Sequence, residues 1–262
     1  MKEIPMYLVS AFSERPFAGN PAAVCLLDAW LADDILLKMA QQHNQSETAF
    51  VVREGESFSL RWFTTRNEVK LCGHATLASA HVIFHHLDFP HAAIHFATAS
   101  GRLTVSREGD WLRLDFPAWA TQESTPPAAL LAGLGIERYV SARRGRAWLI
   151  ELASREEVAA VRPTIAAMTP GEHKVTITAP GDGEYDFVSR FFSPGEAVWE
   201  DPVTGSAHTM LIPFWSARLG KSKMLARQIS PRGGDIRCEL KGDRVLMAGQ
   251  AVTWLQGRIL LR

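Results

Sequence analysis

The pattern of apolar and polar positions predicts many short strands and a few helices. Strands are expected at Met6–Phe12, Ala23–Leu27, Thr48–Arg53 and Phe58–Thr64, the last with the alternation FSLRWF. Apolar residues recur at helical spacing from Trp30 to His43, which predicts an amphipathic helix that ends at the polar run His43–Ser46. The segment His74–His86 is apolar nearly all round, which indicates a central helix surrounded by sheet.

The rest of the chain repeats this theme. After His86 the runs AIHFATASG, LTVSREG and WLRLDFP are typical of strands. Thr121–Gly135 is rich in Pro, Ala and Gly and is predicted to be the linker. We therefore expect one lobe over residues 1–120 and a second over 121–262, with the last strand or so crossing back to the first lobe.

In the second half, strands are expected around Gly145, in KVTITAP, in YDFVSRFFSP and along the C-terminal third, with a short helix at Ser154–Ala167. A second apolar helix is predicted over Ser206–Leu219, closed by Gly220. Pro213 should kink this helix or replace its local hydrogen bonding.

The two apolar helices begin at matching sequences. Cys72-Gly73-His74-Ala75 opens one and Thr204-Gly205-Ser206-Ala207 opens the other. This match predicts a duplicated, two-lobed fold.

Composition narrows the functional classes. Hydrophobic residues make up 47% of the chain and charged residues 21%, as in a globular protein. Lys plus Arg equals Asp plus Glu at 28 each, which argues against a nucleic-acid partner. No segment approaches 18 consecutive apolar residues, so no membrane span is expected, and three dispersed cysteines favour a reducing, cytoplasmic location. Glycine-rich nucleotide motifs are absent, so no cofactor is expected.

Paired helix starts carry a chemical implication. A helix N-terminus leaves backbone N–H groups unpaired and carries the positive end of the dipole. Glycines such as Gly73 and Gly205 let a ligand approach the backbone. If two such ends face one another across an inter-lobe cleft, they bind a carboxylate or stabilise a developing enolate.

Acid/base candidates lie near these helix starts. Glu47 precedes an apolar strand, where partial burial would raise its pKa, although the residues alone favour an ordinary surface glutamate. His74 could transfer a proton or simply pack locally. Asp201 precedes a proline and could start a turn, or orient His74 or a substrate amine. Ser206 could be an N-cap or bind the ligand.

Cysteine and metal chemistry are disfavoured. A two-thiol racemase needs a cysteine at both helix starts, and Thr204 stands opposite Cys72, which is therefore expected to be a packing residue. His81 and His85 could share a metal, but no third ligand with zinc spacing accompanies them, so no metal site is predicted.

Five ordered motifs resemble a known family: FAGNPAAVCLL, NQSETAFV, LRWFTTRNEVKLCGHATLASAHVIF, YDFVSRFFSPGEAVWEDPVTGSAHT and SPRGGDI. From about Met6 to the C-terminus the chain is similar to the phenazine-biosynthesis PhzF-like isomerases, most closely to the phenazine biosynthesis-like domain proteins. The resemblance implies an α+β fold like diaminopimelate epimerase, with two similar lobes that each wrap a curved sheet or barrel around a central helix. A homodimer is commonly implied as well.

The resemblance also assigns roles. In phenazine producers the enzyme isomerises dihydro-hydroxyanthranilate by moving a proton between ring carbons, without cofactor or metal. Its acid/base glutamate falls on Glu47, its histidine on His74, and its aspartate and serine on Asp201 and Ser206. Substrate contacts are expected from the positions Gly73, Ala75, Thr204, Gly205, Ala207 and Asn20.

The predicted function is therefore a cofactor-independent isomerase of a small cyclic carboxylate, with Glu47 as the acid/base group in the inter-lobe cleft. Two alternatives stay open at this point: an epimerase or racemase of an amino or hydroxy acid, and a non-catalytic binding or scaffold protein of the same fold.

Overall fold

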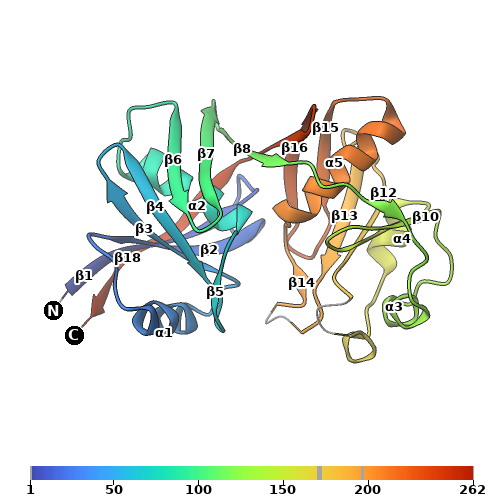
Figure 1. Cartoon of the computed structure of the whole chain (residues 1–262), viewed down its shortest axis with the longest axis horizontal. Helices are drawn as coiled ribbons and strands as arrows, with labels where there is room; N and C mark the ends of the chain where they lie inside the picture. The colour runs from blue at the N-terminus through green and yellow to red at the C-terminus, as the bar shows by residue number, and fades with distance from the viewer. Residues whose placement is uncertain (1, 170–172, 196–197, 262) are drawn as a thin grey trace. The chain divides into compact units, whose positions relative to one another are not determined.

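A computed structural model describes residues 2–169, 173–195 and 198–261 of the chain (Figure 1). Two compact units divide it. Unit 1 comprises Met1–Asp115 and Ala248–Arg262, and unit 2 comprises Phe116–Met247. The chain thus leaves unit 1 after Asp115, five residues before the boundary expected at residue 120, and returns to it for the last strand. None of the helices in the described ranges is long and apolar enough to span a membrane.

Unit 1 is built on a curved sheet around one helix. Its elements are β1 (Lys2–Ala11), β2 (Asn20–Leu27), α1 (Asp33–His43), β3 (Thr48–Glu54), β4 (Ser57–Phe63), β5 (Glu68–Val69), α2 (Gly73–His86), β6 (Ala93–Thr98), β7 (Gly101–Glu108), β8 (Trp111–Pro117) and β18 (Ala251–Leu261). β1 lies between β18 and β2, antiparallel to both, and β2 runs parallel to β3. The sheet continues through β4, β6, β7 and β8.

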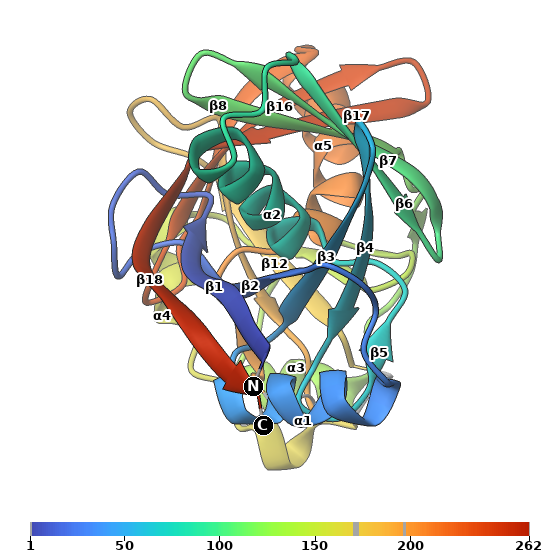
Figure 2. The same cartoon turned by 90° about the vertical axis from the view of Figure 1, so that its left-hand side faces the viewer.

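The central helix α2 is buried because it is apolar on every side. Each residue from His74 to Phe84 is buried, as the sequence predicts. Figure 2 shows the strands β1–β4 and β18 curving around this helix. Four of its residues are alanines or glycines, which let the strands pack closely against its backbone.

Helix α1 covers the outer face of the same sheet. It begins at Asp33, three residues after the expected start, because Ala32 has extended backbone angles (φ −59°, ψ 145°). It ends at His43, and the C-cap residue Asn44 adopts the left-handed conformation (φ 52°) inside the predicted polar stop. Leu36 and Met39 pack from this helix into a second apolar core.

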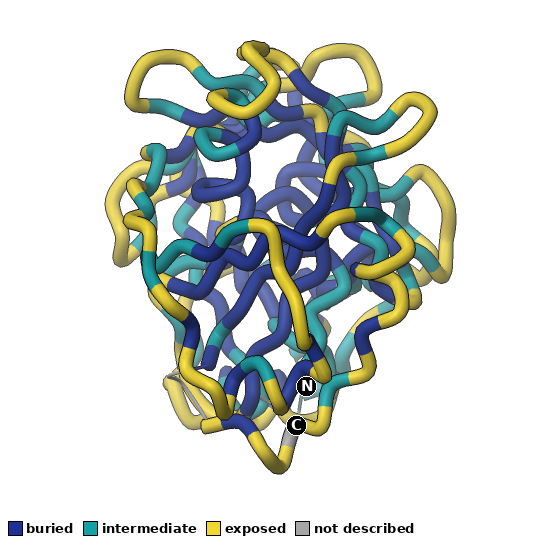
Figure 3. The backbone as a smooth tube through the Cα atoms, turned by 90° about the vertical axis from the view of Figure 1, so that its right-hand side faces the viewer, coloured by how far each residue is buried: buried dark blue, intermediate teal, exposed yellow. Residues whose placement is uncertain are grey.

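Unit 2 has the same kind of architecture. Its elements are β9 (Gln122–Glu123), α3 (Ala128–Leu134), β10 (Ser141–Arg144), β11 (Trp148–Glu151), α4 (Arg155–Ala160), a 3₁₀ turn (Ile165–Ala167), β12 (Val175–Pro180), β13 (Phe187–Phe192), β14 (Glu200–Asp201), α5 (Gly205–Leu219), β15 (Lys223–Gln228), β16 (Gly234–Lys241) and β17 (Arg244–Gly249). In Figure 3 the buried residues lie in the interior and the exposed ones mostly in loops at the rim.

Two expectations for unit 2 were wrong. Thr121–Gly135 is not a linker: it forms β9 and α3, and Leu130 and Leu134 are fully buried in the core because they lie four residues apart on one helix face. The helix expected over Ser154–Ala167 is α4 followed by a separate 3₁₀ turn, because Pro163 interrupts it.

Helix α5 continues through Pro213, as one of the two expected outcomes allows. A proline in a helix has no N–H for the carbonyl four residues earlier. That carbonyl belongs to Thr209, and it accepts the backbone N–H of Trp119 instead (3.0 Å). The segment between β8 and β9 therefore supplies the hydrogen bond that the helix lacks at Pro213.

The strand pairings of the two units follow the same order. In unit 1 the strands pair in parallel for β2–β3, antiparallel for β3–β4, in parallel for β4–β6 and antiparallel for β6–β7. Unit 2 has the same order of directions in the pairs β11–β12, β12–β13, β13–β15 and β15–β16. Thr48 pairs with Phe63 in unit 1, and Val175 pairs with Phe192 at the corresponding place in unit 2. We call such positions equivalent. The duplication predicted from two helix starts thus extends over five strands of each unit.

Candidate active site

The start of α2 is fixed by hydrogen bonds to the carbonyl of its N-cap residue. Its N-cap, Cys72, has extended backbone angles and makes no side-chain capping bond. The carbonyl of Cys72 accepts both the backbone N–H and the hydroxyl of Thr76 (3.1 and 2.5 Å). These bonds fix the first turn, while the N–H groups ahead of it point out of the helix end.

Glu47, Cys72 and His74 meet at this helix start. The Glu47 carboxylate oxygen Oε2 lies 3.4 Å from His74 Nε2, and the Ser46 hydroxyl lies 3.4 Å from the same nitrogen. The other ring nitrogen, Nδ1, is 3.4 Å from the thiol of Cys72. The His74 side chain is 7% exposed and that of Glu47 is 21% exposed. Glu47 and His74, two of the predicted acid/base residues, therefore lie together in one partly buried cluster.

This group can transfer protons, and it could also bind a metal. A carboxylate beside an imidazole can accept a proton from carbon and share it. The ligand atoms of Glu47, Cys72 and His74 all lie within 4.8 Å of one another, and O, N and S ligands suit a zinc-like ion. His81 and His85 belong to no such group in the described ranges, and His81 Nε2 instead contacts the Thr253 hydroxyl (3.1 Å). The absence of a metal site stays a prediction.

The start of α5 has the same backbone form. Its N-cap is Thr204, again extended and without a side-chain capping bond. Ser206 is the second residue of the helix and is exposed, so the reading of Ser206 as an N-cap was wrong. His208 Nδ1 lies 2.8 Å from the carbonyl of Thr204, at the position equivalent to Thr76. Both helix starts thus use a side chain four residues on to hold the N-cap carbonyl.

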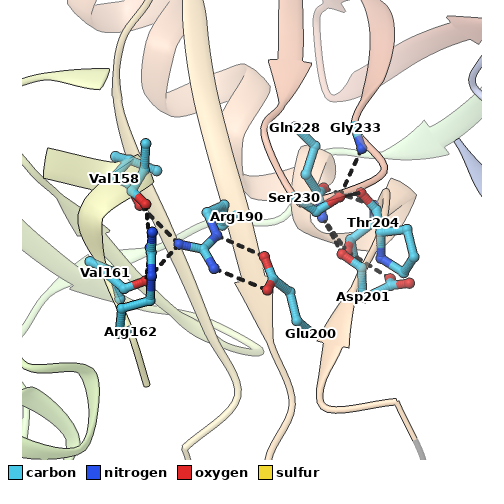
Figure 4. Close-up of polar contacts among 12 residues, drawn as sticks. Val158, Val161, Arg162, Arg190, Glu200, Asp201, Thr204, Gln228, Ser230 and Gly233 are labelled. Carbon is cyan, nitrogen blue, oxygen red and sulfur yellow. Dashed lines mark hydrogen bonds and ion pairs between the residues drawn. The ribbon is translucent and has the colours of Figure 1, made fainter. Parts of the chain in front are cut away.

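Asp201 is tied to this helix start. Its carboxylate oxygen Oδ2 accepts the hydroxyl of Thr204 (2.7 Å), as Figure 4 shows. The role of Asp201 toward His74 or a substrate amine stays a prediction. What the structure shows is that Asp201 and the N-cap of α5 form one hydrogen-bonded unit.

A frame of side chains holds the backbone from Asp201 to Thr204 (Figure 4). Gln228 donates to the Asp201 carbonyl (2.6 Å) and accepts the Thr204 N–H (2.8 Å). Ser230 donates to the carbonyl of Pro202 (2.7 Å) and accepts the N–H of Gly233 (3.1 Å). This frame is not predicted by the sequence, although Ser230 and Gly233 lie in the SPRGGDI motif.

Arg190 anchors the strand that carries Asp201. It makes a two-pronged ion pair with Glu200 (2.7 and 3.0 Å), the residue just before Asp201. It also donates to the carbonyls of Val158 and Val161 at the end of α4 (3.1 and 2.8 Å). The sequence alone does not predict this ion pair, because ten residues separate Arg190 from Glu200.

The remaining predicted substrate contacts differ in exposure. Asn20 is fully buried at the start of β2, after Gly19 (φ 67°), whose missing side chain would lie 2.2 Å from the Ala11 carbonyl. Ala75 and Ala207 are 0% and 1% exposed, so their methyl groups pack in the core. A ligand contact from either alanine would have to use its backbone.

Sequence comparison identifies relatives along the whole chain. The family model described as phenazine biosynthesis-like protein matches residues 9–257. An uncharacterized isomerase of Pseudomonas aeruginosa is 48% identical, and the match covers 99% of this chain and 99% of that protein. A phenazine biosynthesis-like domain-containing protein of Bos taurus is 37% identical over 98% of this chain and 99% of its own length.

Solved structures agree with these relatives. A phenazine biosynthesis protein of the PhzF family from Enterococcus faecalis is 41% identical and superimposes with a TM-score of 0.95 over 99% of this chain and 100% of its own. A hydroxyproline epimerase from Agrobacterium vitis, with bound trans-4-hydroxy-L-proline, reaches a TM-score of 0.60 at 11% identity over 99% of this chain and 91% of that chain, which shows a shared fold alone. The predicted epimerase-like α+β fold is confirmed.

Proposed function

Since the chain belongs to the phenazine biosynthesis-like protein family, we propose that it is a cofactor-independent isomerase of a small cyclic carboxylate. The observation that carries the proposal is the Glu47 carboxylate 3.4 Å from the His74 imidazole, at the start of α2. A carboxylate in this setting is a suitable acid/base group. The named isomerases among the relatives support the reaction class.

In the proposed reaction Glu47 breaks a carbon–hydrogen bond and takes the proton. The electron pair spreads over the conjugated system and the attached carboxylate. The N–H groups at the start of α2 stabilise the charge that develops there. Glu47 then returns the proton to a different carbon, with His74 sharing the proton in between. Atoms and charge balance without an oxidant, a reductant or a metal.

Unit 2 has a binding role in this proposal. Asp201 and Ser206 hold polar groups of the substrate, and Thr204 fixes the Asp201 carboxylate through its hydroxyl. The homodimer implied by the resemblance is part of the proposal. Light scattering of the purified protein tests it, and a monomer at all concentrations would remove it.

Deuterium incorporation tests the reaction. Wild-type protein is incubated in deuterated water with a panel of cyclohexadiene carboxylates, including dihydro-hydroxyanthranilate, and the products are followed by NMR. Deuterium is expected at the carbon that gains the proton. Glu47→Gln should lower the rate by about a thousandfold, whereas Glu68→Gln, a glutamate of the same unit paired with Arg61, should not. Full activity of Glu47→Gln would overturn the mechanism.

Epimerisation is the second candidate, because a hydroxyproline epimerase shares the fold. It predicts inversion at one carbon without migration of a double bond, and chiral chromatography of the product separates the two reactions. Thr204 at the position equivalent to Cys72 weighs against a two-thiol epimerase. A binding protein without turnover would show ligand binding and no deuterium incorporation with the whole panel.

A further inference from the structure

Cys72 belongs to the cluster at the start of α2 but has no part in the proposed proton transfer. Its thiol lies 3.4 Å from Nδ1 of His74, and the Glu47 carboxylate lies 3.4 Å from Nε2 of the same ring. Each of these three residues offers one ligand atom, and the three atoms all lie within 4.8 Å of one another. Sulfur, nitrogen and oxygen atoms of these side chains are the ligands that zinc prefers in proteins.

The separations are close to those of a tetrahedral zinc site. Bonds of about 2.3 Å to sulfur and about 2.0–2.2 Å to nitrogen and oxygen place neighbouring ligand atoms about 3.3–3.6 Å apart. The thiol of Cys72 and Nδ1 of His74, at 3.4 Å, already have this spacing. Because an ion binds only one of the two ring nitrogens, the Glu47 carboxylate must move toward it by about 1 Å. The Glu47 side chain is 21% exposed and unbranched, so it can make this movement.

Charge also favours a divalent ion at this cluster. The Glu47 carboxylate and a Cys72 thiolate together neutralise the two positive charges of the ion, and the His74 imidazole adds a neutral ligand. The complex therefore brings no net charge to a cluster in which the His74 side chain is only 7% exposed. The positive end of the α2 dipole opposes a bare cation, but it stabilises the thiolate that the ion requires. The thiol proton is released to solvent when the ion binds.

The backbone holds two of the ligands in place before an ion binds. Cys72 and His74 lie at the start of α2, two residues apart. The Cys72 carbonyl accepts two hydrogen bonds from Thr76, which fix the first turn. A pair of ligands that is already ordered lowers the entropic cost of binding.

Unit 2 supplies a comparison within the same chain. The start of α5 has Thr204 and Ser206 where the start of α2 has Cys72 and His74. Hydroxyl oxygens replace the sulfur and the nitrogen there, so a soft divalent ion lacks the ligands that it prefers. Among the residues that the structure describes, Glu47, Cys72 and His74 form the single group of three His, Cys, Asp or Glu ligands. One strong site per chain is therefore expected.

We propose that Glu47, Cys72 and His74 bind a thiophilic divalent cation such as zinc from solution, and that this ion inhibits the enzyme reversibly. Three protein ligands leave a fourth position for water, and the partly exposed Glu47 side chain gives access from solvent. The ion occupies the carboxylate and the imidazole that the proposed reaction needs for its proton. It takes no part in the reaction, which distinguishes it from the resident metal that the sequence argues against. The inhibition rests on the proposed function, whereas binding of the ion does not.

Titrations with cobalt(II) and zinc test the binding. Metal-free wild-type protein should bind one cobalt(II) ion per chain, with the near-ultraviolet charge-transfer band of a cobalt–thiolate bond, and zinc should displace it. Cys72→Ala should lose this band and weaken zinc binding by about a hundredfold or more, because loss of an outer partner of a ligand already costs about 10- to 100-fold. Glu47→Gln should keep the band and weaken zinc binding. Cys238→Ala and His86→Gln, which remove a thiol and an imidazole outside the cluster, should match wild type.

Turnover gives an independent readout. The rate of each variant in zinc chloride is divided by its own metal-free rate, and Cys72→Ala should require about a hundredfold more zinc than wild type for equal inhibition. Wild-type protein without the charge-transfer band, or Cys72→Ala with wild-type zinc affinity, would overturn the site. Equal zinc inhibition of wild type and Cys72→Ala would overturn its inhibitory role. If wild type turns over no substrate, the proposed function fails, and the cobalt–thiolate band still decides whether the site exists.

Discussion

Arg190 of β13 is equivalent to Arg61 of β4, and each makes the same ion pair in its own unit. Each arginine stands two residues before the last phenylalanine of its strand and binds a glutamate on the next short strand through two nitrogen–oxygen contacts of 2.7–3.0 Å. Each guanidinium also lies over the ring of that phenylalanine, at 5.2 Å in unit 1 and 4.9 Å in unit 2. The duplication has kept this structural pair, while the chemistry at the helix starts has diverged.

The two ion pairs should differ in energetic weight because they differ in burial. Arg190 and Glu200 are 7% and 8% exposed, whereas Arg61 and Glu68 are 23% and 36% exposed. Arg190→Met leaves a buried carboxylate unpaired and should lower the unfolding free energy by about 3–5 kcal/mol. Arg61→Met, the matched control, should cost about 1 kcal/mol or less. Urea denaturation measures both, and equal losses would contradict the prediction.

The sequence predicted α1, α2, α5 and most strands because their signals are local. The apolar run after Gly73 and the alternation in FSLRWF each point to one structure, and the structure has it. The predicted linker failed for a local reason too: proline and alanine suggested a loop, yet Leu130 and Leu134 supply the apolar face of α3.

The site was only partly predictable, because its remaining parts depend on contacts far apart in the chain. Glu47 was identified through the resemblance and not through its own surroundings, which suggest a surface turn. Gln228 bridges to Thr204, 24 residues away, and Arg190 reaches Val158, 32 residues away. No periodicity encodes such pairs.

Two thiols should be inert in the folded protein. Cys25 and Cys238 are 0% and 3% exposed, and burial raises the pKa of both thiols, so neither forms a thiolate near pH 8. Iodoacetamide labelling followed by peptide mass spectrometry should modify neither residue in the native state and both in denaturant. Any native labelling should be confined to Cys72, and Cys72→Ala should abolish it. Native modification of Cys25 or Cys238 would contradict this prediction.

Stability should fall in mild acid because of buried histidines. Burial lowers the pKa of His208 to about 4 and that of His81 to about 3, with His85 and His86 adding to the effect on His81. Both imidazoles are neutral in the folded protein. The stability that they contribute is therefore fully present above the pKa of about 6.5 that histidine has in the unfolded chain. As the pH falls below that value the unfolded chain takes up protons first. Each histidine then lowers the free energy of unfolding by about 1.4 kcal/mol per pH unit, until the pH reaches the pKa of that histidine in the folded protein.

Urea denaturation near pH 7 and near pH 5 measures this slope. His208→Gln keeps an N–H donor for the Thr204 carbonyl but does not titrate, so its stability should fall less between the two conditions than that of wild type. His81→Gln should behave alike, and the double variant should be the least pH-dependent of the four proteins. A wild-type slope in His208→Gln would show that His208 is protonated in the folded state.

Gln228 should control both stability and proton transfer. Its side chain is fully buried, and its amide group donates to the Asp201 carbonyl and accepts the Thr204 N–H. Gln228→Leu keeps the volume but leaves the Thr204 N–H and the Asp201 carbonyl without this partner. We expect a loss of about 2–4 kcal/mol in unfolding free energy. Gln41→Leu, which removes an exposed bond to Thr65, should cost about 0.5 kcal/mol or less.

The catalytic readout separates positioning from mere stability. At a temperature where Gln228→Leu is fully folded by circular dichroism, deuterium incorporation should fall by about tenfold or more, because Asp201 and the start of α5 lose their fixed backbone. Ser230→Ala removes the hydrogen bond to the Pro202 carbonyl in the same turn, and it should lower deuterium incorporation by a smaller factor. A folded Gln228→Leu with wild-type turnover would mean that the frame around Asp201 stabilises unit 2 without positioning Asp201 for the reaction.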